Sequence, residues 1–324
     1  MTIGTTLRRP GGPPPEAAWN DFAIKIRELT VLRRTYVTPR MVRITLGGEN
    51  ADGFESHTPD EHCKLVFPDA ETGRTRPPVQ DGDHLHWPHP FPPTREYTVR
   101  RYDAAAREVD FDFVVHDGGL AANWAVTCEI GSTLWVAGPR PCLVPSPDFG
   151  FHVLLGDETA LPAIARWLEE LPDDARGVAA VEVADAAEEQ DLRVPDGVEL
   201  TWLHRNGAAP GTTRLLGDFA ETLTLPDEAW TYVWAYAEAG CIKPVRRWAR
   251  AQGVGKKQSD IGGYWKAGRD NSVQAVLADP EREQELRERI PEDDPRHPDN
   301  HHDHDHDDGF PTAPRSGVRR SPRR

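Results

Sequence analysis

The chain has 324 residues, of which 38% are hydrophobic and 28% charged, and its formal net charge at pH 7 is -15. A chain of this length forms one or two domains, and this apolar content suffices for a core. The negative charge argues against general binding to nucleic acid, and no apolar run is long enough to cross a bilayer. The four cysteines are scattered without a CxxC pair, which argues against an iron–sulfur cluster, a zinc ribbon or a disulfide framework.

The first 20 residues are rich in proline and glycine and lack the apolar core of a secretory signal. We therefore expect a flexible leader over residues 1–20 and a cytoplasmic protein. Residues 21–146 then contain short runs with strand character, separated by loops rich in proline and glycine. Such a pattern predicts a small antiparallel β-barrel. The predicted strands span 24–32, 41–46, 62–67, 95–102, 108–116 and 133–137.

The predicted strand at 95–102 carries an arginine and an aromatic residue on one face. Side chains alternate along a strand, so Arg95 and Tyr97 share a face and Thr98 points to the other. An aromatic ring packs on the plane of a flat ligand, and a guanidinium binds phosphate. FAD is such a ligand. The alternative is an ordinary amphipathic strand with a surface arginine.

A glycine turn follows the next predicted strand. Gly118 and Gly119 lead through Leu120, Ala121 and Ala122 into a predicted helix. The beginning of a helix exposes backbone N–H groups and the positive end of the helix dipole, so it favours a phosphate. The alternative is a common glycine turn without a ligand.

Strands and helices alternate over residues 147–278, which predicts a parallel sheet with helices on both faces. A strand at 151–155 leads to Asp157, which we expect to cap a helix. Further strands are predicted at 177–183, 198–203 and 230–236, and a helix at 243–251. Ligands of such sheets bind at the carboxyl ends of the strands. The apolar face of the first helix comprises Leu161, Ile164, Trp167, Leu168 and Leu171.

The last segment, residues 279–324, offers almost nothing to bury, and we expect it to be disordered. Residues 279–308 contain 13 acidic residues and 4 arginines, and the last ten residues are rich in arginine. Histidines alternate with aspartates in the acidic part, which makes them weak candidates for binding Fe(II), Ni(II) or Zn(II), with a solvated tail as the alternative. These are His301, His302, His304 and His306. We predict no firm metal site, and we interpret the group of His84, His86 and His89 as part of a loop.

Together, these motifs in this order resemble the siderophore-interacting protein family, the FAD-dependent ferric-siderophore reductases of the ferredoxin-reductase-like superfamily. The resemblance extends from about residue 24 to residue 269. It implies an N-terminal antiparallel FAD-binding barrel followed by a parallel-sheet nucleotide-binding domain that ends in a substrate-pocket segment. The segments that carry it are 37–46, 64–68, 95–100, 116–125, 155–164, 234–240 and 263–268.

The resemblance also implies the chemistry. Electrons pass from NADH or NADPH through FAD to a ferric siderophore, and Fe(II) is released for iron acquisition. No protein acid or base is required, because the cofactor carries the reaction. The residues implied at the FAD are Arg95, Tyr97, Thr98, His116, Gly118, Gly119, Ala121 and Ala122, with Thr98 near the reactive flavin nitrogen. Those implied on the nicotinamide side are Asp157, Thr159, Ala160 and Glu238.

Ferric siderophores are often anionic, so we expect a basic pocket beside the flavin. The candidates are Lys64, Arg100, Lys256, Lys257 and Lys266. The chain departs from the family at its glycine turn, where hydroxyl side chains are absent, and at Ala237, where the family has glycine. These departures keep two alternatives open: a non-enzymatic iron-chelate-binding protein on the same scaffold, and a flavin reductase that serves another redox partner. A ferredoxin donor also stays open. The sequence does not decide between NADH and NADPH or between siderophores, and we expect a monomer.

Overall fold

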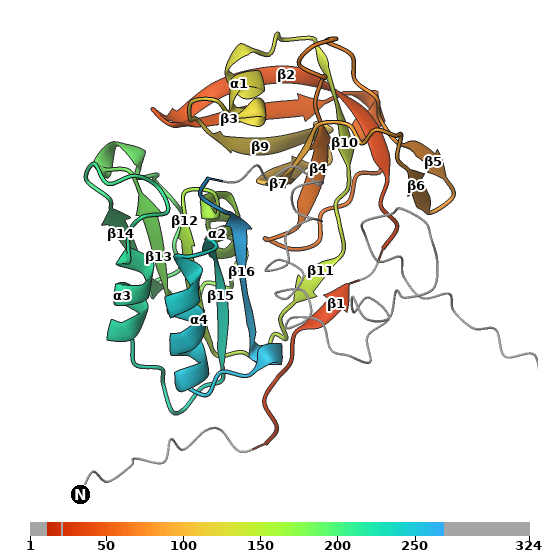
Figure 1. The fold of residues 1–324 in the computed structure, drawn as a ribbon. Helices are drawn as coiled ribbons and strands as arrows, with labels where there is room; N and C mark the ends of the chain where they lie inside the picture. Colours follow the sequence, from red (N-terminus) through yellow and green to blue (C-terminus); the bar gives the residue numbers. More distant parts are fainter. Residues whose placement is uncertain (1–11, 21, 269–324) are drawn as a thin grey trace, which may run out of the picture. The chain divides into compact units, whose positions relative to one another are not determined.

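The structure is a computed structural model and describes residues 12–20 and 22–268. The first half of this region forms a seven-stranded antiparallel sheet that curls into a barrel, with strand order β7-β4-β10-β2-β3-β9-β8 (Figure 1). Five of the six strands predicted for this half are present as single strands, and the strand predicted at 133–137 has the observed bounds. The strands are β2 (Ile26–Thr38), β3 (Met41–Gly47), β4 (His62–Val66), β7 (Thr94–Thr98), β8 (Arg101–Asp103), β9 (Glu108–Val114) and β10 (Thr133–Ala137).

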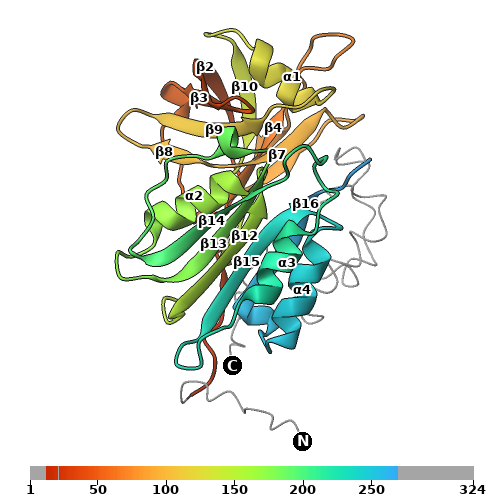
Figure 2. The same cartoon turned by 90° about the vertical axis from the view of Figure 1, so that its left-hand side faces the viewer.

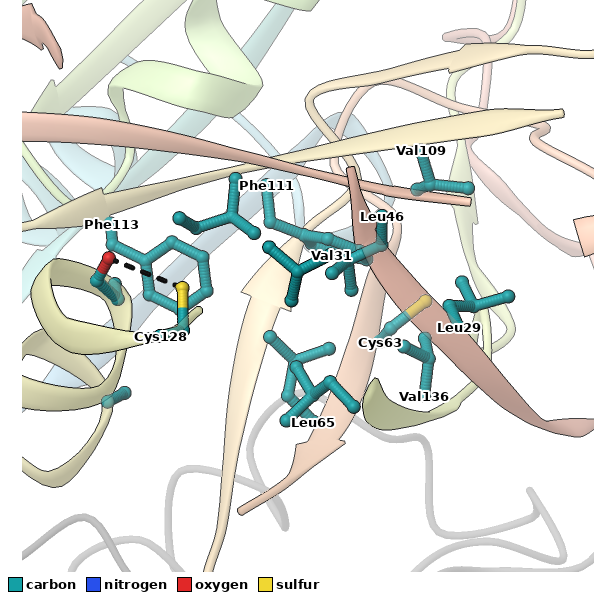
Figure 3. Packing of buried hydrophobic residues seen from close by; sticks show 14 of the residues in the cluster. Leu29, Val31, Leu46, Cys63, Leu65, Val109, Phe111, Phe113, Cys128 and Val136 are labelled. Atoms are coloured by element: carbon teal, nitrogen blue, oxygen red, sulfur yellow. Dashed lines mark hydrogen bonds between the residues drawn. The ribbon is translucent and has the colours of Figure 1, made fainter. Parts of the chain in front are cut away.

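Alternating apolar side chains of these strands fill the barrel (Figure 3). Phe111 and Phe113 of β9 are fully buried, as are Leu65 of β4 and Leu29 of β2. Burying one such side chain contributes about 1.5–3 kcal/mol. The helix α1 (Leu120–Thr127) packs Ala121 and Ala125 against the same cluster.

The strand predicted at 95–102 is broken in two, which corrects the expectation. The backbone N–H of Val99 bonds to the carbonyl of Glu61, and that of Arg100 bonds to the carbonyl of Asp110. The chain therefore leaves β4 and joins β9 as the separate strand β8. As a result, β7 is an edge strand of the sheet.

The second half forms a parallel sheet, as predicted, and this sheet has five strands in the order β14-β13-β12-β15-β16. The helix α2 (Leu161–Glu170) packs on one face, and α3 (Leu215–Thr222) and α4 (Ile242–Ala251) pack on the other (Figure 2). The predicted apolar face of α2 is buried. We did not predict α3, nor the last strand of the sheet as a strand. The strands are β12 (Phe151–Asp157), β13 (Arg176–Val183), β14 (Gly197–His204), β15 (Thr231–Glu238) and β16 (Ser259–Trp265).

Two further pairs of short strands complete the described part. β5 (Val79–Asp81) and β6 (His84–His86) form a hairpin. β1 (Ala18–Asn20) pairs with β11 (Cys142–Val144). Residues 18–20 therefore form a strand, although we expected them to belong to a flexible leader. Among the helices of residues 12–20 and 22–268, none has the length and apolar character to span a membrane. Short 3-10 turns occur at Glu49–Ala51, Ala186–Glu188 and Lys256–Gln258.

Buried polar contacts join the barrel to the parallel sheet. Arg166 of α2 donates to the carboxylate of Glu61 at 3.1 Å and to the carbonyl of Val99 at 2.7 Å. The indole N–H of Trp234 on β15 donates to Asp60 at 3.1 Å. Arg166 and Glu61 are both buried, so the loss of either side chain would leave the other as an unpaired buried charge. These contacts therefore favour one arrangement of the two halves.

Candidate functional site

The edge strand β7 presents the arginine and the tyrosine singled out in the sequence. The Tyr97 ring packs against Phe113, with ring centroids 4.2 Å apart. Burial raises the pKa of Tyr97 well above its ordinary value, so the phenol stays neutral. Arg95 donates to the carbonyl of Thr94 at 2.8 Å. A half-buried ring beside a guanidinium on an edge strand fits a flat ligand that carries phosphate.

The glycine turn forms an amide cradle at the beginning of α1. Gly118 has a φ of 78°, which favours glycine, and Gly119 is the N-cap residue. A Cβ on Gly119 would lie 2.3 Å from Cε1 of His116, so a side chain there would displace the exposed His116 ring. No side chain caps the helix, and its first turn contains no acidic residue. The first backbone N–H groups therefore fit a phosphate of FAD.

Ala121 and Ala122 contribute to this cradle only through their backbone. The two residues are 4% and 2% exposed, and Ala121 packs in the barrel core. The glycine turn lacks the hydroxyl side chains that the family resemblance led us to expect, but the backbone N–H groups at the beginning of α1 do not depend on them. His116 is exposed just before the glycine turn, and its Nδ1 lies 3.2 Å from the carbonyl oxygen of Asp117.

A basic cluster lies on the other face of β7 and β4. Register pairs His62 with Thr98 and Lys64 with Glu96, so these four side chains share one face. Arg140 donates to Oε1 of Glu96 at 2.9 Å, and Nζ of Lys64 lies 3.9 Å from the same atom. The cluster therefore adjoins Thr98, the residue expected near the reactive flavin nitrogen. Arg140 was not predicted, because 44 residues separate it from Glu96 and no local pattern links the two.

Two aromatic rings cover Lys64. Its side chain is 2% exposed, and Nζ lies 5.5 Å from the ring centroids of both Trp87 and Phe91. The two rings stack on each other at 4.6 Å. Burial lowers the pKa of Lys64 to about 7, although the nearby Glu96 opposes the shift. We call Lys64, Glu96, Arg140, Trp87 and Phe91 the Lys64 cluster.

Two buried carboxylates connect the carboxyl ends of the parallel strands through hydrogen bonds. Asp157 accepts from the backbone N–H of Glu238 at 3.0 Å and from the indole N–H of Trp265 at 2.8 Å. Glu238 accepts from the backbone N–H groups of Gly240 and Cys241 at 2.5 and 3.0 Å. Burial raises the pKa of Asp157, against the lowering effect of its hydrogen bonds. Both carboxylates thus shape the edge where nucleotides bind in open sheets.

This arrangement corrects the expected cap. The N-cap of α2 is Ala160, without a side-chain hydrogen bond, while Asp157 instead bonds the N–H and hydroxyl of Thr159 at 2.9 and 2.6 Å. Ala160 is fully buried, so it offers a ligand only its backbone. Ala237, which replaces a glycine of the family, packs on the side of α3 and α4. Its methyl group therefore lies in the core.

An arginine at the same edge is held between two carboxylates. Arg205 lies 2.7 Å from Glu158 and 3.7 Å from Glu182, and its side chain is 2% exposed. Arg214, the N-cap residue of α3, bonds Asp218 at 3.1 Å. The buried Arg205 is therefore held by its two carboxylates, whereas the exposed pair of Arg214 and Asp218 is weak.

Three basic residues predicted for the substrate pocket have other positions. Lys256 and Lys257 precede β16, so they lie at the amino edge of the parallel sheet, opposite Asp157. Lys257 instead pairs with Glu16 at 2.8 Å. Arg100 binds Glu169 of α2 through two hydrogen bonds of 2.8 and 2.5 Å and holds the barrel against that helix. We therefore leave these three out of the proposed pocket.

The remaining predictions divide between the edge of the sheet and the tail. Lys266 follows Trp265 at the carboxyl edge and is partly buried. The histidines at 301, 302, 304 and 306 lie outside the described residues. Within residues 12–20 and 22–268, no group of three or more histidine, cysteine or acidic side chains is arranged to hold a metal ion.

An antiparallel barrel followed by a parallel sheet is the ferredoxin-reductase-like fold. The ferredoxin reductase of carbazole 1,9a-dioxygenase shares this fold, with a TM-score of 0.53 at 14% identity over 75% of this chain and 70% of that one. Residues 30–142 match the profile of the siderophore-interacting FAD-binding domain, and residues 150–268 match that of the siderophore-interacting protein. The chain belongs to the siderophore-interacting protein family, as the sequence motifs predicted.

Individual relatives agree. The chain is 35% identical to the NADPH-dependent ferric-chelate reductase of Escherichia coli, over 78% of this chain and 97% of the relative. It is 33% identical to the ferric vibriobactin reductase ViuB of Vibrio cholerae, over 76% and 92%. Among solved structures, a siderophore utilization protein from T. fusca is 46% identical, with a TM-score of 0.75, over 79% of this chain and 98% of that one.

Proposed function

We propose that this protein reduces ferric siderophores, passing electrons from NADH or NADPH through FAD to the chelate so that Fe(II) is released. The observation that carries the proposal is the strand pair β4–β7. One face of this pair carries Arg95 and Tyr97, and the other carries the Lys64 cluster. The residues that would hold FAD and those that would receive the chelate therefore lie on one pair of strands.

Different residues of the barrel would contact different parts of FAD. Arg95 and the first N–H groups of α1 neutralise its phosphates, and Tyr97 packs against its ring system. Thr98 supplies a hydroxyl at the end of the strand, where it is 7% exposed. When bound, FAD supplies the exchange between two-electron and one-electron chemistry.

The carboxyl edge of the parallel sheet is the proposed seat of the nicotinamide nucleotide. Asp157 and Glu238 hold the ends of β12, β15 and β16 together through their hydrogen bonds. Thr159 and Lys266 lie at this edge, where they face the donor. The name of the Escherichia coli relative, an NADPH-dependent reductase, supports a nicotinamide donor.

An anaerobic absorbance experiment on the purified protein tests the proposal. NADH or NADPH should bleach the flavin band, and a ferric siderophore should then restore it while a ferrous chelator traps Fe(II). Flavin that bleaches with neither nucleotide would point to another donor, such as a reduced ferredoxin. A purified protein that neither retains nor takes up FAD would refute the proposal.

A further inference from the structure

The carboxyl ends of β12, β13 and β14 enclose one buried arginine between two carboxylates. The backbone N–H of Arg205, the residue after β14, bonds to the carbonyl of Val183 at the end of β13. The guanidinium of Arg205 lies 2.7 Å from Glu158 and 3.7 Å from Glu182, and the side chain is 2% exposed. Within the described residues, its Nε is buried and makes no hydrogen bond. One cation therefore serves two carboxylates at this edge.

The order of the strands indicates which part of a nucleotide reaches this arginine. Glu238 at the end of β15 and Trp265 at the end of β16 lie on one side of β12, on the proposed nicotinamide side. A dinucleotide that extends the other way along the edge brings its adenosine ribose to the ends of β13 and β14. In open sheets an acidic residue here binds the ribose hydroxyls of NAD, whereas a nearby arginine accommodates the 2′-phosphate of NADP.

Arg205 is a poor partner for such a phosphate. Both oxygens of Glu158 lie within 3.0 Å of one guanidinium nitrogen, so a phosphate would have to displace this carboxylate. Glu182 would stay beside the phosphate, because the hydroxyl of Thr213 holds it at 2.7 Å. A phosphate adds about two negative charges next to these carboxylates, and like charges at short range repel. The arginine is present, but its carboxylate partners oppose a second anion.

The same strand ends offer an acceptor to an unphosphorylated ribose. Asp185 is exposed two residues after β13, and its Oδ1 accepts from the backbone N–H of Ala187 at 2.9 Å. Among residues 12–20 and 22–268, its other oxygen accepts no hydrogen bond. A carboxylate oxygen accepts from a ribose hydroxyl, whereas it repels a phosphate.

We propose that this edge binds NADH in preference to NADPH, with Glu158 as the specificity-determining residue that denies Arg205 to the 2′-phosphate. The inference rests on the proposed function and names the electron donor of that reaction. The two nucleotides differ only in the phosphate on the adenosine ribose, away from the nicotinamide that gives up the hydride. The preference therefore lies in binding. It would set this chain apart from the Escherichia coli relative, which is named an NADPH-dependent reductase.

ADP-ribose and 2′-phospho-ADP-ribose test the preference without electron transfer, because they carry the two kinds of ribose and no nicotinamide. Titration calorimetry on the full-length, FAD-loaded protein measures both affinities. We expect ADP-ribose to bind about thirtyfold more tightly. Equal affinities would overturn the inference. A preference for the phosphorylated analogue would also overturn it, and loss of that preference in Arg214→Gln would assign the phosphate to this exposed arginine.

Variants locate the effect. Glu158→Gln keeps the shape of the side chain and removes its charge, so 2′-phospho-ADP-ribose should bind about tenfold more tightly and ADP-ribose as before. Asp185→Asn alters an exposed residue and should weaken ADP-ribose about fivefold. The matched control is Glu199→Gln, exposed on β14, which should change neither affinity. An unchanged ratio of the two affinities in both edge variants would overturn the assignment to these carboxylates.

A second measurement separates this inference from the proposed function. Flavin reduction by NADH and by NADPH is followed anaerobically by stopped-flow absorbance. We expect half-saturation at a lower concentration of NADH and similar limiting rates. Equal half-saturating concentrations overturn the inference alone. Reduction by neither nucleotide overturns it together with the nicotinamide donor, whereas failure of light-reduced flavin to pass electrons to a ferric siderophore refutes the reductase itself.

Discussion

A buried aspartate between the barrel and the parallel sheet should make the protein less stable as the pH rises. Asp60 is 7% exposed, accepts from Trp234 at 3.1 Å and from Thr58 at 3.1 Å, and lies near Asp260, which is 4% exposed and accepts from Tyr236 at 2.7 Å. Burial, followed by the charge of Asp260, raises the pKa of Asp60 from 3.8 to about 7.

The sign follows from proton counting. Between pH 3.8 and about 7 the folded protein holds a proton on Asp60 that the unfolded chain has lost. The free energy of unfolding therefore falls with rising pH across this window, by up to about 1.4 kcal/mol per pH unit, and then levels off. The total is at most about 4 kcal/mol. Asp60→Asn keeps an oxygen for the Trp234 indole and removes the charge, so we expect it to stabilise the protein by about 2–4 kcal/mol at pH 8.

Urea unfolding followed by circular dichroism at pH 5, 6, 7 and 8 measures this effect. Asp60→Asn should gain stability at pH 8, gain little at pH 5, and flatten the dependence between them. The exposed Asp174→Asn is the matched control and should follow the parent protein. An Asp60→Asn protein that is less stable than the parent at pH 8, or that keeps the parent's pH slope, would refute the reasoning.

Three further predictions concern the site and its support. Arg95→Leu should weaken FAD retention at least about tenfold while the fold persists, because a phosphate loses its guanidinium; equilibrium dialysis of the flavin measures this, and unchanged retention would contradict the assignment. Arg166→Met should cost about 3–5 kcal/mol in urea unfolding, because the fully buried Glu61 loses its partner, and a loss below about 1 kcal/mol would show that this pair is dispensable. Affinity for an anionic ferric siderophore should fall as the pH rises past about 7, where Lys64 loses its proton, and Lys64→Met should abolish this dependence; a slope that persists in the variant would exclude Lys64 as its source.

The fold was largely predictable because its signals are local. Apolar positions repeat along α2 with the period of a helix, and the strand at Thr133–Ala137 is bounded by polar turns on both sides. The order of strands and helices then limits the architecture to a barrel and a parallel sheet. The turn at Gly118 and Gly119 is local as well, so its place before α1 was also visible in the sequence.

Side-chain partners were harder to predict, since they depend on the register of distant strands. The break after Thr98 arises from hydrogen bonds to Glu61 and Asp110, and a local pattern contains neither partner. Arg140 reaches Glu96 only because β4, β7 and β10 are neighbours in the sheet. Lys256 and Lys257 were predicted to bind the substrate because of their charge alone. The direction of β16 instead places them at the amino edge of the parallel sheet, away from Asp157.

The short pairing of β1 with β11 has a consequence for how the protein can be shortened. A protein that began at residue 22 would keep the whole matched family region, which starts at residue 30, and all of β2, but would lose β1 as well as the bond from the N–H of Ala17 to the carbonyl of Lys257. Strand β11 belongs to the connection between the barrel and the parallel sheet, and trimming would leave its backbone donors and acceptors exposed as a bare edge. Such edges recruit other strands. The trimmed protein should therefore self-associate. It should also lose the connection that the segment before β2 makes with β11 and with the loop before β16 (Figure 1).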